Sequence, residues 1–167
     1  FGKMTVHSLS VSDGTFVYTN QSVSPRITIP IDSIDFEVSD ISLNTAFPML
    51  ISATLWSESK NLQISGSAEV SDNNYQLRIE DATIKSDLSQ LSLPEVYNSF
   101  PGIAGFKLDR KMEGQIEVLV NQAIISDEGL SALSGNGRVT DGRVQYLNYP
   151  ILFEDLNANF EFSDSDF

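Results

Sequence analysis

Apolar residues alternate with polar ones along most of the chain. The most regular stretch runs from Phe47 to Leu55 and resumes from Leu62 to Val70, after the polar residues 58–61. A period of two is typical of a β-strand with one apolar and one polar face. The pattern therefore predicts a β-hairpin over these residues.

The alternation changes register at several places. Apolar positions are odd-numbered from Ile27 to Ile31, even-numbered from Ile34 to Val38, and odd-numbered again at Ile41. We expect β-bulges or bends near residues 32–33 and 39–40, because one extra residue in a strand lets the apolar side chains on either side of it point to the same face of the sheet. Gly114 is expected to mark a further bulge.

One short segment has the features of a helix. Pro94 can occupy the first turn of a helix, and Pro101 with Gly102 would end it, so residues 94–100 are the best helical candidate. The rest of the chain alternates or contains turn residues, and the period of residues 124–134 is ambiguous. The fold class is therefore mostly β: an antiparallel, strongly curved, groove-like meander of about ten to twelve strands with one or two short helices.

A ten-residue stretch occurs twice. Residues 11–20 and 139–148 agree at five of ten positions, and both contain an Asp-Gly pair, Asp13-Gly14 and Asp141-Gly142. The two Asp-Gly pairs are 128 residues apart. Each copy continues into a second similar string, at residues 36–40 and 160–164, and these strings are 124 residues apart. The loop between the pair and the string is therefore predicted to differ in length by four residues between the two copies. Asp-Gly favours a tight turn, so we expect hairpin turns at both sites.

The length and the repeat bear on domain organisation. A chain of 167 residues is expected to form a single β-rich domain, residues 1–167. The repeat units near residues 4–45 and 133–167 indicate a module from a larger repeat-containing protein.

Charge and composition exclude several kinds of function. The chain has 10 basic and 23 acidic residues, a formal net charge of −13, and its basic residues are scattered except for Arg110 and Lys111. Binding of nucleic acid needs a basic face, so nucleic acid is not an expected partner. Cysteine is absent, which excludes a disulfide framework and thiolate zinc sites. The sequence shows neither a signal peptide nor an apolar run long enough to span a membrane.

The residues offer little for catalysis. The one histidine, His7, has no nucleophile motif around it, and the usual hydrolase, P-loop and zinc-protease motifs are absent. Glu154 with Asp155, and the acidic residues of 163–166, supply oxygen ligands that calcium prefers, but no calcium-loop pattern accompanies them. We expect no enzyme activity, no cofactor and no metal.

The apolar face of the predicted strands is the remaining candidate for function. A curled sheet would present it as a groove that accommodates phospholipid acyl chains, whereas a closed sandwich would bury it as core; periodicity does not separate these two. The groove candidates are Ile51, Ala53, Leu55, Leu62, Ile64, Ala68, Val70, Leu77 and Ile79.

The chain resembles the AsmA-like family of bacterial envelope proteins, to which TamB and bridge-like lipid-transfer proteins are similar. The stretches that carry the resemblance are residues 9–18, 34–43, 61–66, 133–144 and 151–160. It implies a curved, repeating β-sheet in the periplasm, with an apolar groove for lipid transfer or a role in outer-membrane assembly. It also implies other envelope proteins as partners, and a parent chain anchored in the inner membrane through parts not included here. The family has no catalytic residues to carry over.

Two alternatives come from the aromatic and acidic residues. A secreted β-sandwich for adhesion or carbohydrate binding would use Trp56, Tyr97 and Tyr149 as stacking surfaces. A hydrolase would need paired carboxylates, but Glu154 and Asp155 are adjacent and would face opposite sides of a strand.

Overall fold

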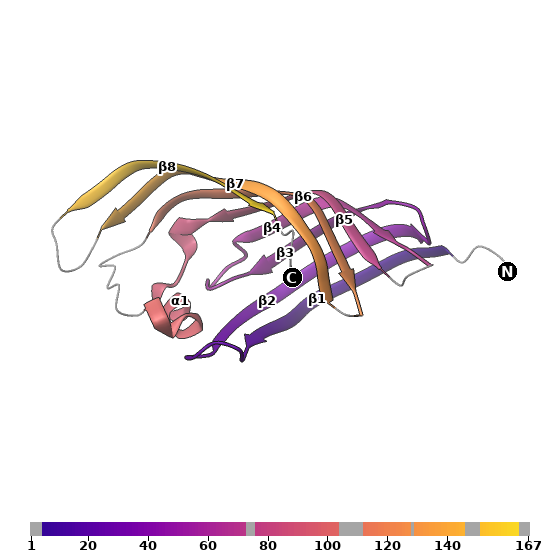
Figure 1. The fold of residues 1–167 in the computed structure, drawn as a ribbon, viewed down its shortest axis with the longest axis horizontal. Helices are drawn as coiled ribbons and strands as arrows, with labels where there is room; N and C mark the ends of the chain where they lie inside the picture. The colour runs from indigo at the N-terminus through magenta and orange to yellow at the C-terminus, as the bar shows by residue number, and fades with distance from the viewer. Residues whose placement is uncertain (1–4, 73–75, 104–111, 128, 146–150, 164–167) are drawn as a thin grey trace.

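A single antiparallel sheet dominates the protein. A computed structural model describes residues 5–72, 76–103, 112–127, 129–145 and 151–163. Its eight strands are hydrogen-bonded in chain order, and each runs opposite to its neighbours (Figure 1). The strands are β1 (Thr5–Asn20), β2 (Ile27–Ser42), β3 (Phe47–Thr54), β4 (Leu62–Val70), β5 (Leu77–Asp87), β6 (Glu113–Ser126), β7 (Gly129–Gln145) and β8 (Leu152–Ser163).

A short helical segment connects β5 to β6. The helix α1 (Leu93–Ser99) lies between two 3₁₀ turns, η1 (Leu88–Gln90) and η2 (Pro101–Ile103). Pro94 is in the first turn of α1, as the sequence predicts. Asp87 caps η1, since its carboxylate accepts hydrogen bonds from the backbone N–H and the hydroxyl of Ser89. These bonds, led by the one from the Ser89 hydroxyl, lower the pKa of Asp87 below its ordinary value.

The sheet has fewer strands than we expected, eight instead of ten to twelve. The expected hairpin turns at Asp13-Gly14 and Asp141-Gly142 are wrong. Both pairs lie inside long continuous strands, β1 and β7, where Asp13 and Asp141 have φ of 55° and 52°. A residue with positive φ suits a bulge as well as a turn, so each of these sites bends one strand instead of separating two.

The same double bulge occurs at both ends of the sheet. In β1 and β2 the register shifts on either side of the Gly14–Ile34 pair, and in β7 and β8 on either side of the Gly142–Leu156 pair. The backbone N–H of Asp13 donates to the Asp35 side chain at 3.1 Å, and that of Asp141 donates to the Asn157 side chain at 3.4 Å. The repeat is therefore present in the structure as well as in the sequence.

The positions of the bulges give a different spacing between the two copies of the repeat from the one that the sequence suggests. Ser33 and Asp155 both have positive φ at corresponding places in β2 and β8, and they are 122 residues apart. The two copies therefore differ by six residues, because the string at 36–40 is displaced by two positions from its apparent match at 160–164. A displacement of two keeps the same side chains on the same face.

The predicted bulges near residues 32–33 and at Gly114 are confirmed as register shifts. Ser33 has a φ of 49° where β2 gains one residue relative to β1. Asp40 has a φ of 53°, but the pairing of β1 with β2 keeps its register there, because Val6 is opposite Ile41 and Ser8 is opposite Ser39. Gly114 has a φ of 126° beside a register shift between β6 and β7. The bulge at Ser33 keeps Ile31, Ile34 and Phe36 on one face, although their numbers change parity.

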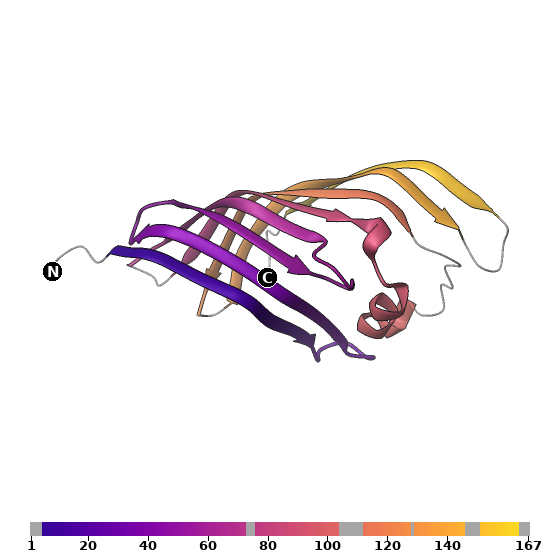
Figure 2. The same cartoon turned by 180° about the vertical axis from the view of Figure 1, so that it is seen from behind.

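The sheet bends and twists along its strands but is neither closed nor strongly curled, so the strong curvature we expected is also corrected (Figures 1 and 2). β1 and β8 each pair with a single neighbour and form its two edges. The described residues contain one sheet, and the two-sheet arrangement of a β-sandwich is not found among them. The ambiguous segment at residues 124–134 forms the end of β6 and the start of β7.

Small residues allow the strands to approach closely on the apolar face. A Cβ added at Gly135 would lie 2.2 Å from the backbone oxygen of Leu119 and 2.5 Å from the ring of Phe162. The three atoms nearest to a Cβ added at Gly137 all belong to the ring of Phe160, the first of them at 2.2 Å. Phe162 and Phe160 of β8 thus cover the glycines opposite to them in β7, Gly135 and Gly137, and the two rings are 6.4 Å apart.

This difference predicts unequal costs for two alanine substitutions. Gly135→Ala is expected to lower the free energy of unfolding by roughly 2 kcal/mol or more, because the Leu119 carbonyl cannot move without distorting β6. Gly137→Ala is expected to cost less than about 1 kcal/mol, because the exposed Phe160 ring can rotate away. Urea unfolding followed by circular dichroism measures both, and equal destabilisation would contradict the packing described.

Candidate functional site

Most apolar side chains of β1 to β5 lie on one face of the sheet, which we call the inner face. Residues directly opposite one another on neighbouring strands share a face. Val11 is opposite Phe36, Phe36 is opposite Ile51, and Ile51 is opposite Ile64. This chain of pairs continues from Ile64 to Ile84 on β5. The inner face is thus continuous across five strands.

The inner face is hollowed at its centre. The hollow has a volume of about 350 Å³. All of its lining side chains are apolar and come from β1 to β5: Val11, Ile34, Phe36, Phe47, Met49, Ile51, Ala68, Leu77 and Ile79. Because it contains no hydrogen-bonding side chain, its chemistry suits a hydrocarbon ligand and not a sugar or an ion.

Eight of the nine predicted groove residues lie on the inner face. Four of them, Ile51, Ala68, Leu77 and Ile79, line the hollow. Ile64 and Val70 pack against the core cluster on the same face, and Ala53 is buried opposite Leu62. Continuous alternation through β3, β4 and β5 is what made them predictable.

Leu55 does not belong to this set. It follows the end of β3, where its backbone N–H donates to the Asn61 side chain at 2.9 Å and its carbonyl accepts from the same amide at 3.0 Å. Asn61 is buried, and these two bonds satisfy its polar atoms and close the β3–β4 connection. Leu55 is therefore part of a turn.

Five residues that line the hollow were not among the predicted candidates. Phe47 and Met49 belong to β3, Ile34 and Phe36 to β2, and Val11 to β1. Their alternation is visible in the sequence, and those in β1 and β2 are separated from the regular hairpin by the bulges. The bulges conceal that Val11, Ile34 and Phe36 share the inner face. Phe47 and Met49 continue the alternation of Ile51 on β3 and could have been included from the sequence.

The core on the inner face is thin. Its buried members are Val38, Phe47, Met49, Ala68, Ala82, Val120 and Ala123. None of the described residues combines a large side chain with complete burial. A domain normally buries its apolar face between two packed layers, and here a second layer is not found among the described residues. As far as the described residues are concerned, the inner face therefore remains accessible.

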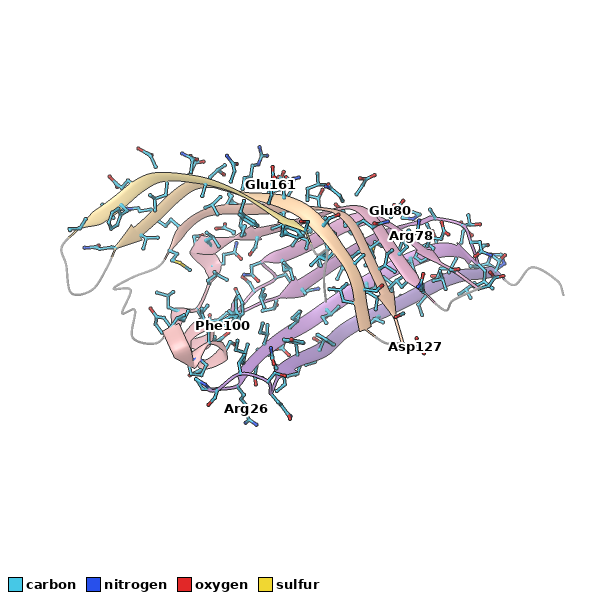
Figure 3. The ribbon with its side chains drawn as sticks, in the orientation of Figure 1. Arg26, Arg78, Glu80, Phe100, Asp127 and Glu161 are labelled. Carbon is cyan, nitrogen blue, oxygen red and sulfur yellow. The ribbon has the colours of Figure 1, made fainter. Side chains whose placement is uncertain are left out.

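The opposite, outer face carries charged side chains in ladders. Glu117 of β6 lies 3.4 Å from Lys85 of β5 and 3.1 Å from Arg138 of β7. Loss of hydration alone would raise the pKa of Glu117, but the charges of Arg138 and Lys85 outweigh it and hold the pKa below its ordinary value. Figure 3 shows Arg78, Glu80 and Glu161 on this side of the sheet. The two faces thus differ sharply in polarity.

A second ladder crosses β6, β7 and β8. Arg143 lies 3.5 Å from Glu113 and 3.3 Å from Glu154. Near the other edge, Lys60 pairs with Asp35, and this pairing, helped by the Asp13 N–H, lowers the pKa of Asp35. Such exposed pairs contribute little to stability, because water and salt screen the charges. Their main effect is to keep the outer face hydrated.

The helix α1 is anchored at the end of the sheet where β2 begins and β3 ends (Figures 1 and 2). The indole N–H of Trp56 donates to the hydroxyl of Ser99 at 2.8 Å, and its carbonyl accepts from the Ser92 N–H at 2.6 Å. The Trp56 ring also meets Phe100 edge-on, with centroids 5.5 Å apart. Trp56 therefore has a structural role in holding the helix.

A polar hollow of about 490 Å³ lies beside α1. It is lined by Thr28, Pro30, Asp32, Ser33, Thr54, Ser57, Glu58, Glu95, Asn98 and Ser99. Of the aromatic residues considered for sugar stacking, Trp56 packs on Phe100, Tyr97 lies on α1, and Tyr149 lies outside the described residues. Neither Trp56 nor Tyr97 lines either hollow.

The other chemical candidates do not come together. His7 is exposed on β1, with its ring nitrogen 3.8 Å from a carboxylate oxygen of Asp40. Glu154 pairs with Arg143, while Asp155 has a φ of 54° at the β8 bulge. Across the described ranges, no three histidine or acidic side chains are grouped so that they could hold a metal ion. Residues 164–167 lie outside the described residues.

Comparisons with protein-family models, with curated proteins and with solved structures gave no match for this chain. The resemblance to the AsmA-like family thus stays a prediction from the sequence. None of the helices in the described part of the chain is long and apolar enough to cross a membrane.

The anchoring of α1 predicts a spectroscopic effect. Ser99→Ala removes the acceptor of the Trp56 N–H, which leaves a half-buried donor unpaired at a cost of about 1–3 kcal/mol. We expect the emission maximum of Trp56, the single tryptophan, to shift to longer wavelength. We also expect the change in its fluorescence during urea unfolding to occur at a lower urea concentration. Asn98→Ala, an exposed neighbour on α1, is the control. An unchanged Ser99→Ala spectrum would show that this hydrogen bond does not hold the helix.

Proposed function

We propose that this protein is a non-enzymatic lipid-binding module, whose inner face accommodates the acyl chain of a phospholipid. The observation that carries the proposal is the hollow of about 350 Å³ on an uncovered apolar face, with a lining that contains no polar side chain. A ligand that fills it must itself be apolar, because any polar group placed there would lose its hydrogen bonds to water.

The size of the hollow suits part of a lipid. Ligand pockets usually have volumes of about 300 to 1,000 Å³, so this one is near the lower limit. It matches an acyl chain better than a whole phospholipid, whose headgroup would stay at the rim. Each buried methylene contributes about 0.8 kcal/mol, and a chain lying across several strands would gain enough to offset the cost of association.

The context of the module comes from the sequence resemblance. By analogy with AsmA-like proteins, we infer a place in the bacterial periplasm, within a larger parent anchored in the inner membrane. There it would act with other envelope proteins in lipid transfer or outer-membrane assembly. The polar outer face and the net charge of −13 support a module that is hydrated on one side while the other side meets lipid.

Adjacent residues of β3 supply a matched test. Ile51 lines the hollow, whereas Leu50 is on the outer face and is 55% exposed. Ile51→Asp is expected to weaken binding of a pyrene-labelled phosphatidylcholine at least tenfold, because the carboxylate must be desolvated when the acyl chain enters. Leu50→Asp introduces the same charge one residue away and is expected to bind as the unaltered protein does.

Fluorescence titration measures both affinities, and circular dichroism confirms that both variants fold. Native mass spectrometry of the unaltered protein with the same lipid gives the stoichiometry. A folded Ile51→Asp protein that binds the lipid with full affinity would contradict the proposal. An equal loss of lipid affinity in the two variants would also contradict the proposal, because binding would then not depend on the inner face.

A further inference from the structure

The two edges of the sheet are long and unprotected. β1 has 16 residues and β8 has 12, and among the described residues each leaves one row of backbone groups without a neighbouring strand. Natural edge strands usually carry lysine or proline, which hinder pairing with another chain. Neither β1 nor β8 contains a lysine, an arginine or a proline. Both edges are therefore competent to pair.

Large apolar side chains are exposed along both edges. Leu9 of β1 is 47% exposed and Phe153 of β8 is 50% exposed. They belong to the inner face, because Leu9 is opposite the core residue Val38 and Phe153 is opposite Val144. The other exposed apolar residues of the two strands are Val11, Phe16, Val17, Tyr18, Leu152, Leu156 and Phe160. A strand added at either edge would cover part of this surface.

The internal repeat allows each free edge strand to be compared with a strand inside the sheet that has the same bulges. The double bulges make β7 the counterpart of β1 and β8 the counterpart of β2. β7 is paired on its other side by β6, and β2 by β3, in both cases antiparallel. The counterpart of each free edge is thus covered by a further antiparallel strand with apolar residues on the inner face.

A second copy of the chain can supply that strand. Because the sheet has an even number of alternating strands, β8 runs opposite to β1. A copy placed beside the first in the same orientation brings its β1 antiparallel to β8, with both inner faces on the same side. The bulge at Asp13 can then lie beside the bulge at Asp155, just as the Asp141 bulge lies beside Asp155 within one chain.

The charges of the edge strands favour pairing of β8 with β1 over pairing of two β8 strands. β8 carries three acidic residues, Glu154, Asp155 and Glu161, so pairing of two β8 strands would bring six carboxylates together. Asp13 is the one acidic residue of β1, and His7 is its one basic residue. Pairing of β8 with β1 therefore brings four carboxylates to the junction instead of six, and it covers both kinds of edge, which pairing of two β1 strands does not.

We propose that copies of this chain associate head to tail, with β8 of one copy pairing antiparallel with β1 of the next, so that the sheet and its inner face continue from copy to copy. The interface is heterologous, and assembly is therefore open-ended. The net charge of −13 on each copy opposes association, so screening by salt strengthens it. The proposal is independent of lipid binding.

Sedimentation velocity of the purified protein is the first test. In 0.5 M NaCl, where the Debye length falls to about 4 Å, we expect the weight-average mass to rise with protein concentration beyond that of a dimer. At low salt we expect the mass to fall toward that of a single chain. A protein that remains monomeric at high salt and high concentration would overturn the proposal.

Two edge variants test the head-to-tail geometry. Leu9→Lys blocks β1 and leaves β8 intact, and Phe153→Lys blocks β8 and leaves β1 intact, because a lysine on the inner face of an edge hinders an incoming strand. Each variant alone is expected to be monomeric, while an equimolar mixture is expected to form 1:1 dimers. Recovery of dimers in the mixture would also show that both variants are folded.

Leu50→Lys is the matched control. It makes the same substitution at an exposed leucine of the internal strand β3, and it is expected to assemble as the unaltered chain does. Val11→Lys provides a second block on β1. Dimers formed by either edge variant alone would indicate pairing of like edges and would overturn the proposal, as would a mixture that stays monomeric or a control that fails to assemble.

Discussion

An apolar face that no second layer covers, within the part of the chain that the structure describes, is the constraint on which the rest of this structure depends. Eight antiparallel strands place aliphatic and aromatic side chains on one side of a single sheet, and only a thin cluster of them is buried. Burial of apolar surface is the main favourable term in folding, so a sheet of this kind depends on its strand pairing and cross-strand contacts more than a two-layer domain does. The Gly-Phe pairs of β7 and β8 and the ion pairs of the outer face contribute to that pairing.

The bulges maintain the two-faced character over strands of up to 17 residues. Aspartate or serine at positive φ adds one residue to a strand, so apolar residues on odd and even positions reach the same face. This explains how Ile31 and Ile34 both face inward, and why the Asp-Gly pairs occur twice. The repeated double bulge gives the two edges related geometry, and the same feature therefore organises the inner face and relates β1 to β7.

The sequence predicted the parts that depend on uninterrupted local patterns. The β3–β4 hairpin, the inner-face residues of β3 to β5 and the helix after Pro94 follow from period-two alternation and from the fixed φ of proline. The strand count was wrong because Asp-Gly occurs both in turns and in bulges, and φ alone does not distinguish them. Val11, Ile34 and Phe36 were missed as lining residues because only the cross-strand register shows that they lie beside Ile51. Whether the apolar face is buried or open could not be predicted, since both cases have the same alternation.

The central claim is that the inner face is a binding surface for hydrocarbon. Methyl NMR of the protein with a fatty acid that carries a spin label on its acyl chain tests it most directly, because the label broadens only nearby signals. We predict broadening of the methyl groups of Ile51, Ile64 and Ile79, with the outer-face methyl groups of Leu50 unaffected. Equal broadening on both faces, or broadening confined to α1, would contradict the account.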